Sequence, residues 1–332
     1  MTARGHRIAF VLLPRFSLMA FASASEPLRV ANHLAGAPLY RWFLISTDGQ
    51  PVTSSNGMTS AVQHGLADAP TVDRVIVCAS FEPRRAVTPA LRAWLRRAAA
   101  AGVSIGGIDT GSEVLARCGL LAGYRATIHW EWLDAFRGAY PETTVTQDVF
   151  VTDRRRFSAA GGTACLDLML NFIRDQHGHT LAAAVSDQFV YNRIRQHGDA
   201  QRMALEDRLP VRSRRLARAI GAMEGHIDEP LSIPALAAHA GVSVRELERL
   251  LQRWLKTTPG AYYRRLRLER ARSLLALSAN SISEIALACG FGSPAGFSRA
   301  YRVCFGESPR AARHRTLGLG AGNADNKQTE PV

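Results

Sequence analysis

One short segment has the form of the elbow on which many enzymes carry a nucleophile. An apolar run, Val103–Ile108, is followed by Asp109, then by Gly111, and then by a helical pattern that ends near Cys118. Such a strand–turn–helix lifts its apex side chain into the crevice above a sheet and directs free helix-start N–H groups to the same place. Here the apex is a carboxylate, so thiolate chemistry is not expected. An aspartate nucleophile would be the enzymatic alternative.

Residues near this elbow in the fold could form a site for a cation. Asp109 and Glu26 supply negative charge, and Trp130 follows His129 directly. Carboxylates beside aromatic faces suit a cationic nitrogen, through ion pairing and cation–π attraction. The competing interpretation is that Asp109 only caps its helix, because Asp is a favoured N-cap residue. Both interpretations stay open at this point.

The five cysteines give no sign of a metal site, a disulfide framework or a catalytic thiol. They are odd in number and widely spaced, without a C-x-x-C pair, at positions Cys78, Cys118, Cys165, Cys289 and Cys304. Cys118 and Cys165 fall within expected helices, where a cysteine usually serves packing. We therefore predict no bound metal and no cofactor.

Most of the excess positive charge lies in the last third of the chain. The whole sequence of 332 residues carries 41 Lys+Arg and 28 Asp+Glu, a net charge of +13. Residues 209–332 hold 19 of the basic and 10 of the acidic side chains, a net charge of +9. A basic region beside a nearly neutral one indicates a module for a polyanion, either nucleic acid or a membrane surface.

The basic third contains an internal repeat. The pattern that begins at Ile233 and ends at Gly241 recurs from Ile282 to Gly290, an offset of 49 residues. Each glycine stops a helix and is followed by a serine that opens another. Helix, glycine turn and helix form a helix-turn-helix, and two copies favour DNA over a membrane surface.

The second helix of each copy has one apolar stripe and one polar face. We expect the stripes to pack inward, the second of them including Cys304. The outward side chains are the candidate contacts to DNA: Arg245, Arg249 and Arg253 on the first helix, and Ser298, Arg299 and Arg302 on the second. Between the copies, residues 259–277 predict a helix on the order of 28 Å long, which could hold two reading helices in successive major grooves.

The elements that must position the elbow alternate between β and α. Buried strands are predicted at Ile8–Leu13, Trp42–Ser46, Val75–Cys78 and Val103–Ile108. Helices are predicted at Glu26–Leu34, Pro89–Ala101 and Thr163–Gln176, and a short β-ribbon at Thr144–Ala160. This alternation predicts an α/β fold, a doubly wound sheet with ligands at the carboxyl ends of its strands.

The strings GIDTGSEVLARCGLLAG and RATIHWE resemble the PfpI-like, class I glutamine amidotransferase-like fold, which is flavodoxin-like. In its enzymes the apex is Cys, so Asp109 is a departure that removes the nucleophile. The fuller strings resemble the subgroup of regulators that sense arginine, carnitine or glycine betaine. That resemblance implies ligand-binding roles for Glu26, Asp109, Thr110, His129 and Trp130.

The string ACGFGSPAGFSRAYRVCFGESPRAAR resembles the AraC/XylS family of transcription regulators. It implies an all-α double helix-turn-helix domain, double-stranded DNA as partner and a homodimer. We therefore predict a sensing and dimerisation domain at 1–195, a linker at 196–211, a DNA-binding domain at 212–316 and a disordered tail at 317–332. The expected protein is a cytoplasmic, ligand-controlled transcription regulator, more often an activator. The alternative is a PfpI-type hydrolase or deglycase with an accessory DNA-binding module.

Overall fold

The chain forms two compact units, residues 1–203 and 204–332. The computed structural model describes residues 5–202, 205–211, 213–277 and 280–317. The predicted tail lies outside the described residues from position 318 onward. Across the described ranges, no helix combines the length and apolarity needed to span a bilayer.

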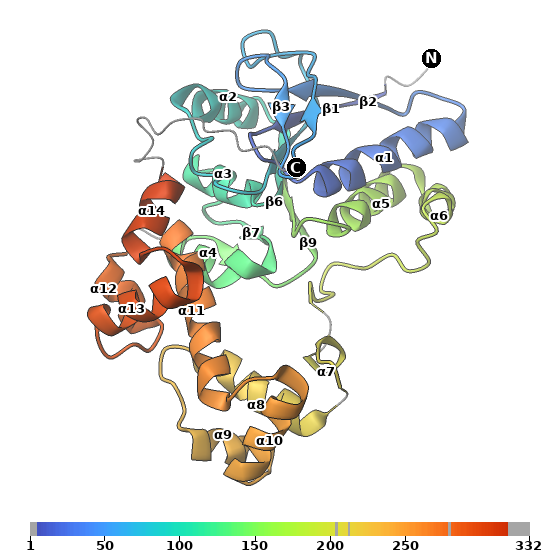
Figure 1. Ribbon diagram of the computed structural model, residues 1–332. Helices are drawn as coiled ribbons and strands as arrows, with labels where there is room; N and C mark the ends of the chain where they lie inside the picture. Colours follow the sequence, from blue (N-terminus) through green and yellow to red (C-terminus); the bar gives the residue numbers. More distant parts are fainter. Residues whose placement is uncertain (1–4, 203–204, 212, 278–279, 318–332) are drawn as a thin grey trace, which may run out of the picture. The chain divides into compact units, whose positions relative to one another are not determined.

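The first unit is built on a six-stranded sheet with the order β2-β1-β5-β6-β10-β9 (Figure 1). Its strands are β1 (His6–Leu12), β2 (Tyr40–Ile45), β5 (Arg74–Ala79), β6 (Ser104–Asp109), β9 (Phe150–Asp153) and β10 (Arg156–Ala159). All pair in parallel except β9, which is an antiparallel edge strand. Counted along the chain without β9, the strand order is 2-1-3-4-5, which is the predicted flavodoxin-like arrangement.

The four predicted strands are confirmed to within three residues at each end. Their nearly continuous apolar sequence fits strands that are buried on both faces. The segment predicted as a short β-ribbon contributes to the main sheet. Its hairpin β9–β10 joins the main sheet, because β10 pairs in parallel with β6 from Arg156 to Ala159.

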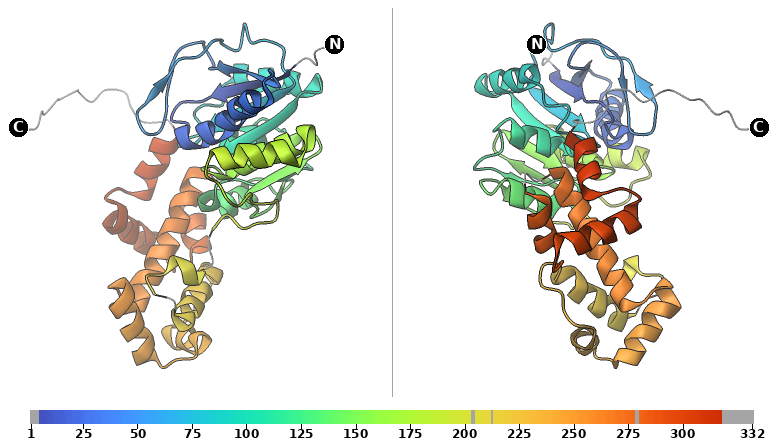
Figure 2. Two further views of the ribbon diagram at one scale, coloured as in Figure 1. Left: turned by 90° about the vertical axis from the view of Figure 1, so that its right-hand side faces the viewer. Right: turned by 60° about the vertical axis from the view of Figure 1, so that its left-hand side comes forward.

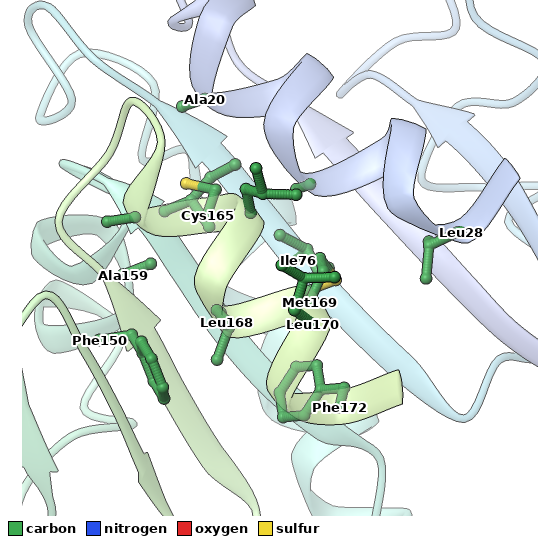
Figure 3. Close-up of a cluster of buried hydrophobic side chains, with 14 of the residues drawn as sticks. Ala20, Leu28, Ile76, Phe150, Ala159, Cys165, Leu168, Met169, Leu170 and Phe172 are labelled. Carbon is green, nitrogen blue, oxygen red and sulfur yellow. The ribbon is translucent and has the colours of Figure 1, made fainter. Parts of the chain in front are cut away.

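Helices cover both faces of the sheet. The cluster on one face combines residues of α1 (Leu18–Ala35), α5 (Ala164–His177) and α6 (His179–Gln188), with α1 and α5 side by side (Figures 1 and 2). Figure 3 shows α5 presenting Cys165, Leu168 and Met169 within this core. The cluster on the other face combines residues of α2 (Pro89–Ala100), α3 (Gly111–Arg117) and α4 (Leu133–Ala139).

Short elements complete the first unit. They are β3 (Val52–Thr53), β4 (Thr59–Ser60), β7 (Arg125–Ala126), β8 (Thr144–Val145) and the 3₁₀ turn η1 (Trp130–Trp132). The helix α2 begins where it was predicted, because the Thr88 hydroxyl accepts from the Leu91 N–H and Pro89 occupies the first turn. The helix α1 begins eight residues earlier than predicted, at a cap formed by Ser17.

In the part that the structure describes, the second unit consists of helices and the loops between them. Its elements are α7 (Leu205–Arg208), α8 (Arg214–Gly225), α9 (Ile233–Ala240), α10 (Val244–Leu255), α11 (Pro259–Leu277), α12 (Ile282–Ala288), α13 (Pro294–Phe305) and α14 (Pro309–Leu317). The repeat of the sequence is a repeat of structure. Leu236 and Ile285 are fully buried at matching positions, and Gly241 and Gly290 both turn with positive φ, +67° and +70°.

The two helix-turn-helix copies are fixed to each other through the second turn. A Cβ at Gly290 would lie 2.4 Å from the Pro230 ring, so this turn packs directly on the loop between α8 and α9. The Gly290 carbonyl oxygen also accepts from Arg267 on α11, at 2.7 Å. The long helix therefore holds both copies in one arrangement.

The helix α3 approaches the sheet as closely as its backbone permits. A Cβ at Gly111 would lie 2.3 Å from the Val77 carbonyl oxygen on β5. Only glycine fits at this position without a shift of the backbone, and the shift would displace the turn that carries Asp109.

We expect Gly111→Ala to lower the free energy of unfolding by about 1–3 kcal/mol, because the added methyl group overpacks against a backbone oxygen. The matched control is Gly138→Ala within α4, where an added Cβ meets nothing within 4 Å. There the better helix propensity of Ala should raise stability by up to about 1 kcal/mol. Urea unfolding of both variants checks the pair, and equal effects would contradict the packing argument.

Candidate functional site

Asp109 is the apex of a strained turn at the end of β6. Its φ is +60°, a left-handed conformation that few residues other than glycine adopt. The side chain is buried, with 8% of the residue exposed. The N-cap residue of α3 is Thr110, and no side chain caps the helix. The interpretation that Asp109 only caps its helix is therefore wrong.

The carboxyl group of Asp109 is held in an environment that resists its ionisation. Burial raises the pKa of Asp109 to about 7, and the charge of Glu131 also raises it. Hydrogen bonds from Ser80 and from the Thr110 N–H act in the opposite direction and lower it. Gly161 covers the group from the loop after β10, because a Cβ there would lie 3.1 Å from the Asp109 side chain. Keeping this carboxylate ionised above pH 7 costs on the order of 4 kcal/mol.

The turn η1 carries aromatic and acidic side chains, and the charge of one of them, Glu131, acts on Asp109. Trp130 leaves 39% of its surface exposed, and the His129 ring lies 5.5 Å from it. His129 Nδ1 is 4.0 Å from a Glu131 carboxylate oxygen, yet burial lowers the pKa of His129. His129 is therefore mostly neutral at pH 7. Glu131 is the charged residue that sequence reasoning missed, although it stands next to Trp130 in the chain.

Two of the predicted ligand-binding residues have other partners. The carboxylate of Glu26 is 44% exposed and accepts from Arg29 one helical turn away, at 2.8 Å. Thr110 is buried, and its hydroxyl donates to the Ser80 carbonyl oxygen at 2.6 Å. The Thr110 hydroxyl thereby ties the loop after β5 to the elbow.

The cysteines of the first unit are buried, and burial raises the pKa of each thiol. Cys165 is close enough to Asp109 for that charge to raise its pKa further. No thiolate is therefore available at the elbow. The described residues also contain no cluster of three or more His, Cys, Asp or Glu side chains placed to hold a metal ion.

Two surface hollows lie away from the elbow. One is lined by residues of α3, α4 and the segment after it, and the other by His6, Arg7 and residues 71–73. Neither includes Asp109 or Trp130. The carboxyl groups that line the hollows, Glu142 and Asp73, are exposed, whereas the carboxyl group at the elbow is buried.

A segment near the end of the first unit lies against the same site. Gln201 donates through Nε2 to the carbonyl oxygens of Ile128 and Asp148, at 2.9 and 3.1 Å, and to the Thr127 hydroxyl at 2.8 Å. The guanidinium carbon of Arg202 lies 4.1 Å from the centroid of the Trp130 ring. The first part of the expected linker is thus hydrogen-bonded to the first unit.

In the second unit, α10 and α13 are the second helices of the two helix-turn-helix copies. The predicted DNA contacts Arg245, Arg249, Arg253, Arg299 and Arg302 are exposed, and Ser298 is half-buried. Arg249 forms an ion pair with Glu246 at 2.8 Å. A DNA phosphate would have to compete with the Glu246 carboxylate for the Arg249 guanidinium.

The apolar stripes of these helices face inward, with one exception. Leu247 and Leu251 on α10 are fully buried, as are Phe297 and Tyr301 on α13. Cys304, which was expected in the second stripe, is exposed. Cys304 lies outside the stripe, and the next residue, Phe305, continues it by contacting Tyr301 with ring centroids 4.6 Å apart and an interplanar angle of 56°.

Two families match the two units. Residues 6–175 match the DJ-1/PfpI family, and residues 236–315 match a helix-turn-helix domain. A crystal structure of an AraC family transcriptional regulator from Pseudomonas putida is similar with a TM-score of 0.51 and 32% identity. The similarity covers 55% of this chain and 99% of that one.

Relatives are similar along nearly the whole chain. The HTH-type transcriptional regulator CdhR of Pseudomonas aeruginosa is 50% identical over 304 residues, 92% of this chain and 90% of that protein. The HTH-type transcriptional regulator GbdR of the same species is 44% identical over 306 residues, 92% of this chain and 83% of that protein. The chain belongs to the AraC family of DNA-binding transcription regulators, in the group that joins a DJ-1/PfpI-like domain to the helix-turn-helix domain.

Proposed function

We propose that the effector of this regulator is a small nitrogenous compound with a cationic group, of the class of arginine, carnitine or glycine betaine. The observation that carries the proposal is the buried Asp109 carboxyl group. Its pKa is raised, a second carboxylate contributes to the rise, and no cation is among the groups that shift it. A ligand cation would relieve this unfavourable charge, and the exposed Trp130 face offers cation–π attraction beside it.

We also propose that the elbow binds and does not catalyse. A carboxyl group stands where the enzymatic relatives carry a thiol, and the buried thiols of the first unit have raised pKa values. The hydrolase alternative would have to use Asp109 itself as the nucleophile. Turnover that is abolished in Asp109→Asn would support that alternative.

We propose that the regulator acts in the cytoplasm as a homodimer and activates transcription at tandem major-groove sites. The rigid connection of α11 to the second turn supports tandem sites, because it fixes the two reading helices relative to each other. Sedimentation of the full chain tests the dimer. A reporter fused to its operator tests the sign of regulation.

Calorimetry of the full chain with glycine betaine, L-carnitine and L-arginine tests the pocket. Asp109→Asn should weaken binding of the true effector roughly tenfold to hundredfold, because it removes a charge-assisted contact. Trp130→Ala should weaken it several-fold through loss of the cation–π contact. Asp134→Asn on α4 is the matched control and should leave affinity within about twofold, because Asp134 is an exposed carboxylate paired with Arg137. Equal affinities in all three variants would refute the pocket.

The affinity for a cationic effector should depend on pH through Asp109. Its pKa in the free protein is about 7. Below that pH the ligand must displace a proton, so the affinity should fall by up to tenfold per pH unit. Above pH 7 it should be nearly constant. His129 titrates lower and would add repulsion only in more acidic solution. The Asp109→Asn variant should show a flat profile between pH 6 and 8, and a slope in that variant would exclude Asp109 as its source.

Removal of arginines from α13 should weaken operator binding. Arg299→Ala or Arg302→Ala should cost about 1–3 kcal/mol and relax specificity if the side chain contacts a base. If it contacts a phosphate, the loss should be uniform across sequences and the salt slope should fall by about 1. Arg97→Ala on α2 is the matched control, because it removes the same charge from the first unit. Gel shifts at several salt concentrations check this, and a loss as large in the control would contradict it.

A further inference from the structure

Residues 199–202 form a strap that is hydrogen-bonded to the segments just before β9 and η1. The Val149 N–H donates to the Asp199 carbonyl oxygen at 2.9 Å, and Ala200 forms an antiparallel bridge with Asp148. These contacts extend the edge of the sheet at the start of β9. Gln201 then adds its three hydrogen bonds to Thr127, Ile128 and Asp148.

The strap ends with a cation on the aromatic face of the site. The Arg202 guanidinium carbon is 4.1 Å from the Trp130 ring centroid, well within the range of cation–π attraction. Trp130 adjoins Glu131, whose charge reaches Asp109. The chain thus already places a planar, cationic nitrogen group on the aromatic face that the proposed effector would use, while Arg202 is not among the groups that shift the pKa of Asp109.

The strap is anchored at its start, on α5. Just before it, Arg195 donates through Nε to Asp167 at 2.8 Å, and the Asp167 side chain is fully buried in α5. Tyr191 donates to the same carboxylate. Gln196 Oε1 also accepts from Arg174 on α5, at 3.0 Å. Release of the strap would therefore stop at Gln196. Beyond Arg202, two residues lead to α7 of the second unit.

We propose that Arg202 is an internal competitor of the effector, and that effector binding on Trp130 displaces the strap. This inference rests on the proposed function. Displacement moves the last anchored residue from Arg202 back to Gln196, which adds six residues to the tether. Extended, they span on the order of 20 Å. The effector thereby changes how far the DNA-binding unit can reach, without any change inside that unit.

The first test is the affinity of the full chain for glycine betaine, L-carnitine and L-arginine by calorimetry. Arg202→Ala should tighten binding about threefold to thirtyfold, because the effector no longer displaces a cation–π contact. The effector affinity of Arg202→Lys should lie between the affinities of Arg202→Ala and the wild type, since an ammonium group lacks the planar stacking of guanidinium. Arg137→Ala, which removes an exposed arginine of α4, should leave the affinity unchanged.

The second test is hydrogen exchange at the Val149 amide, which donates into the strap. Effector should speed exchange in the wild type. Gln201→Ala should speed it without effector, because it removes three hydrogen bonds of the strap while Arg202 and Trp130 remain. Arg202→Ala should do the same, and Arg137→Ala should not.

The outcomes separate the strap from the pocket. Unchanged or weaker effector binding in Arg202→Ala, with wild-type binding intact, would overturn the strap and leave the proposed function standing. An exchange rate of the Val149 amide that does not change when effector is added would also overturn the strap. If none of the three compounds binds any variant, the cationic effector is wrong. In that case the exchange rate of the Val149 amide in Gln201→Ala and Arg202→Ala tests the strap. Rates as slow as in the wild type would refute it.

Discussion

The left-handed backbone of Asp109 and the close approach of Gly111 to the Val77 carbonyl oxygen determine where the Asp109 carboxyl group lies. Together they hold α3 against β5 and lift one side chain to the carboxyl edge of the sheet. In a thiol enzyme this geometry serves a nucleophile. With aspartate at the apex, the same geometry holds a carboxyl group whose ionisation is disfavoured by burial. A site that resists its own negative charge is suited to bind a positive one.

The second unit limits how such a signal could be used. Gly290 packs on Pro230 and accepts from Arg267, so the two helix-turn-helix copies cannot easily shift relative to each other. A DNA-binding unit whose two copies keep a fixed arrangement is most simply regulated through the segment that connects it to the sensing unit. In the proposed mechanism, regulation acts on the residues just before the second unit, where Gln201 and Arg202 contact the first.

The sequence predicted those elements whose signals are local. The strands β1 and β5 are continuous apolar runs, and Thr88 with Pro89 marks the start of α2. The repeat of residues 233–241 predicted both helix-turn-helix copies. The start of α1 was missed because residues 18–25 are small and largely apolar, a pattern without a polar face that would show helical spacing.

The site was predicted only in part, because its geometry depends on loops. The sequence pattern of a strand, an apex residue and a glycine predicted the elbow, and this pattern identified Asp109 as its apex. The partnership of Glu26 with Arg29 was visible as an i, i+3 pair, but nothing local placed Glu131 near Asp109. That proximity follows from the path of the chain between β7 and η1, for which the sequence has no periodic signal.

The strap shows why polar segments are the hardest to interpret. A solvated linker and a docked strap have the same composition, because a docked strap is held by hydrogen bonds to backbone atoms and buries little apolar surface. Gln201 reaches two carbonyl oxygens that any sequence would offer. Arg202 is one of many arginines, and only the fold brings it to Trp130. Weak attachment of this kind is also what a competitor requires, since a strap held by buried apolar side chains could not be displaced by a small cation.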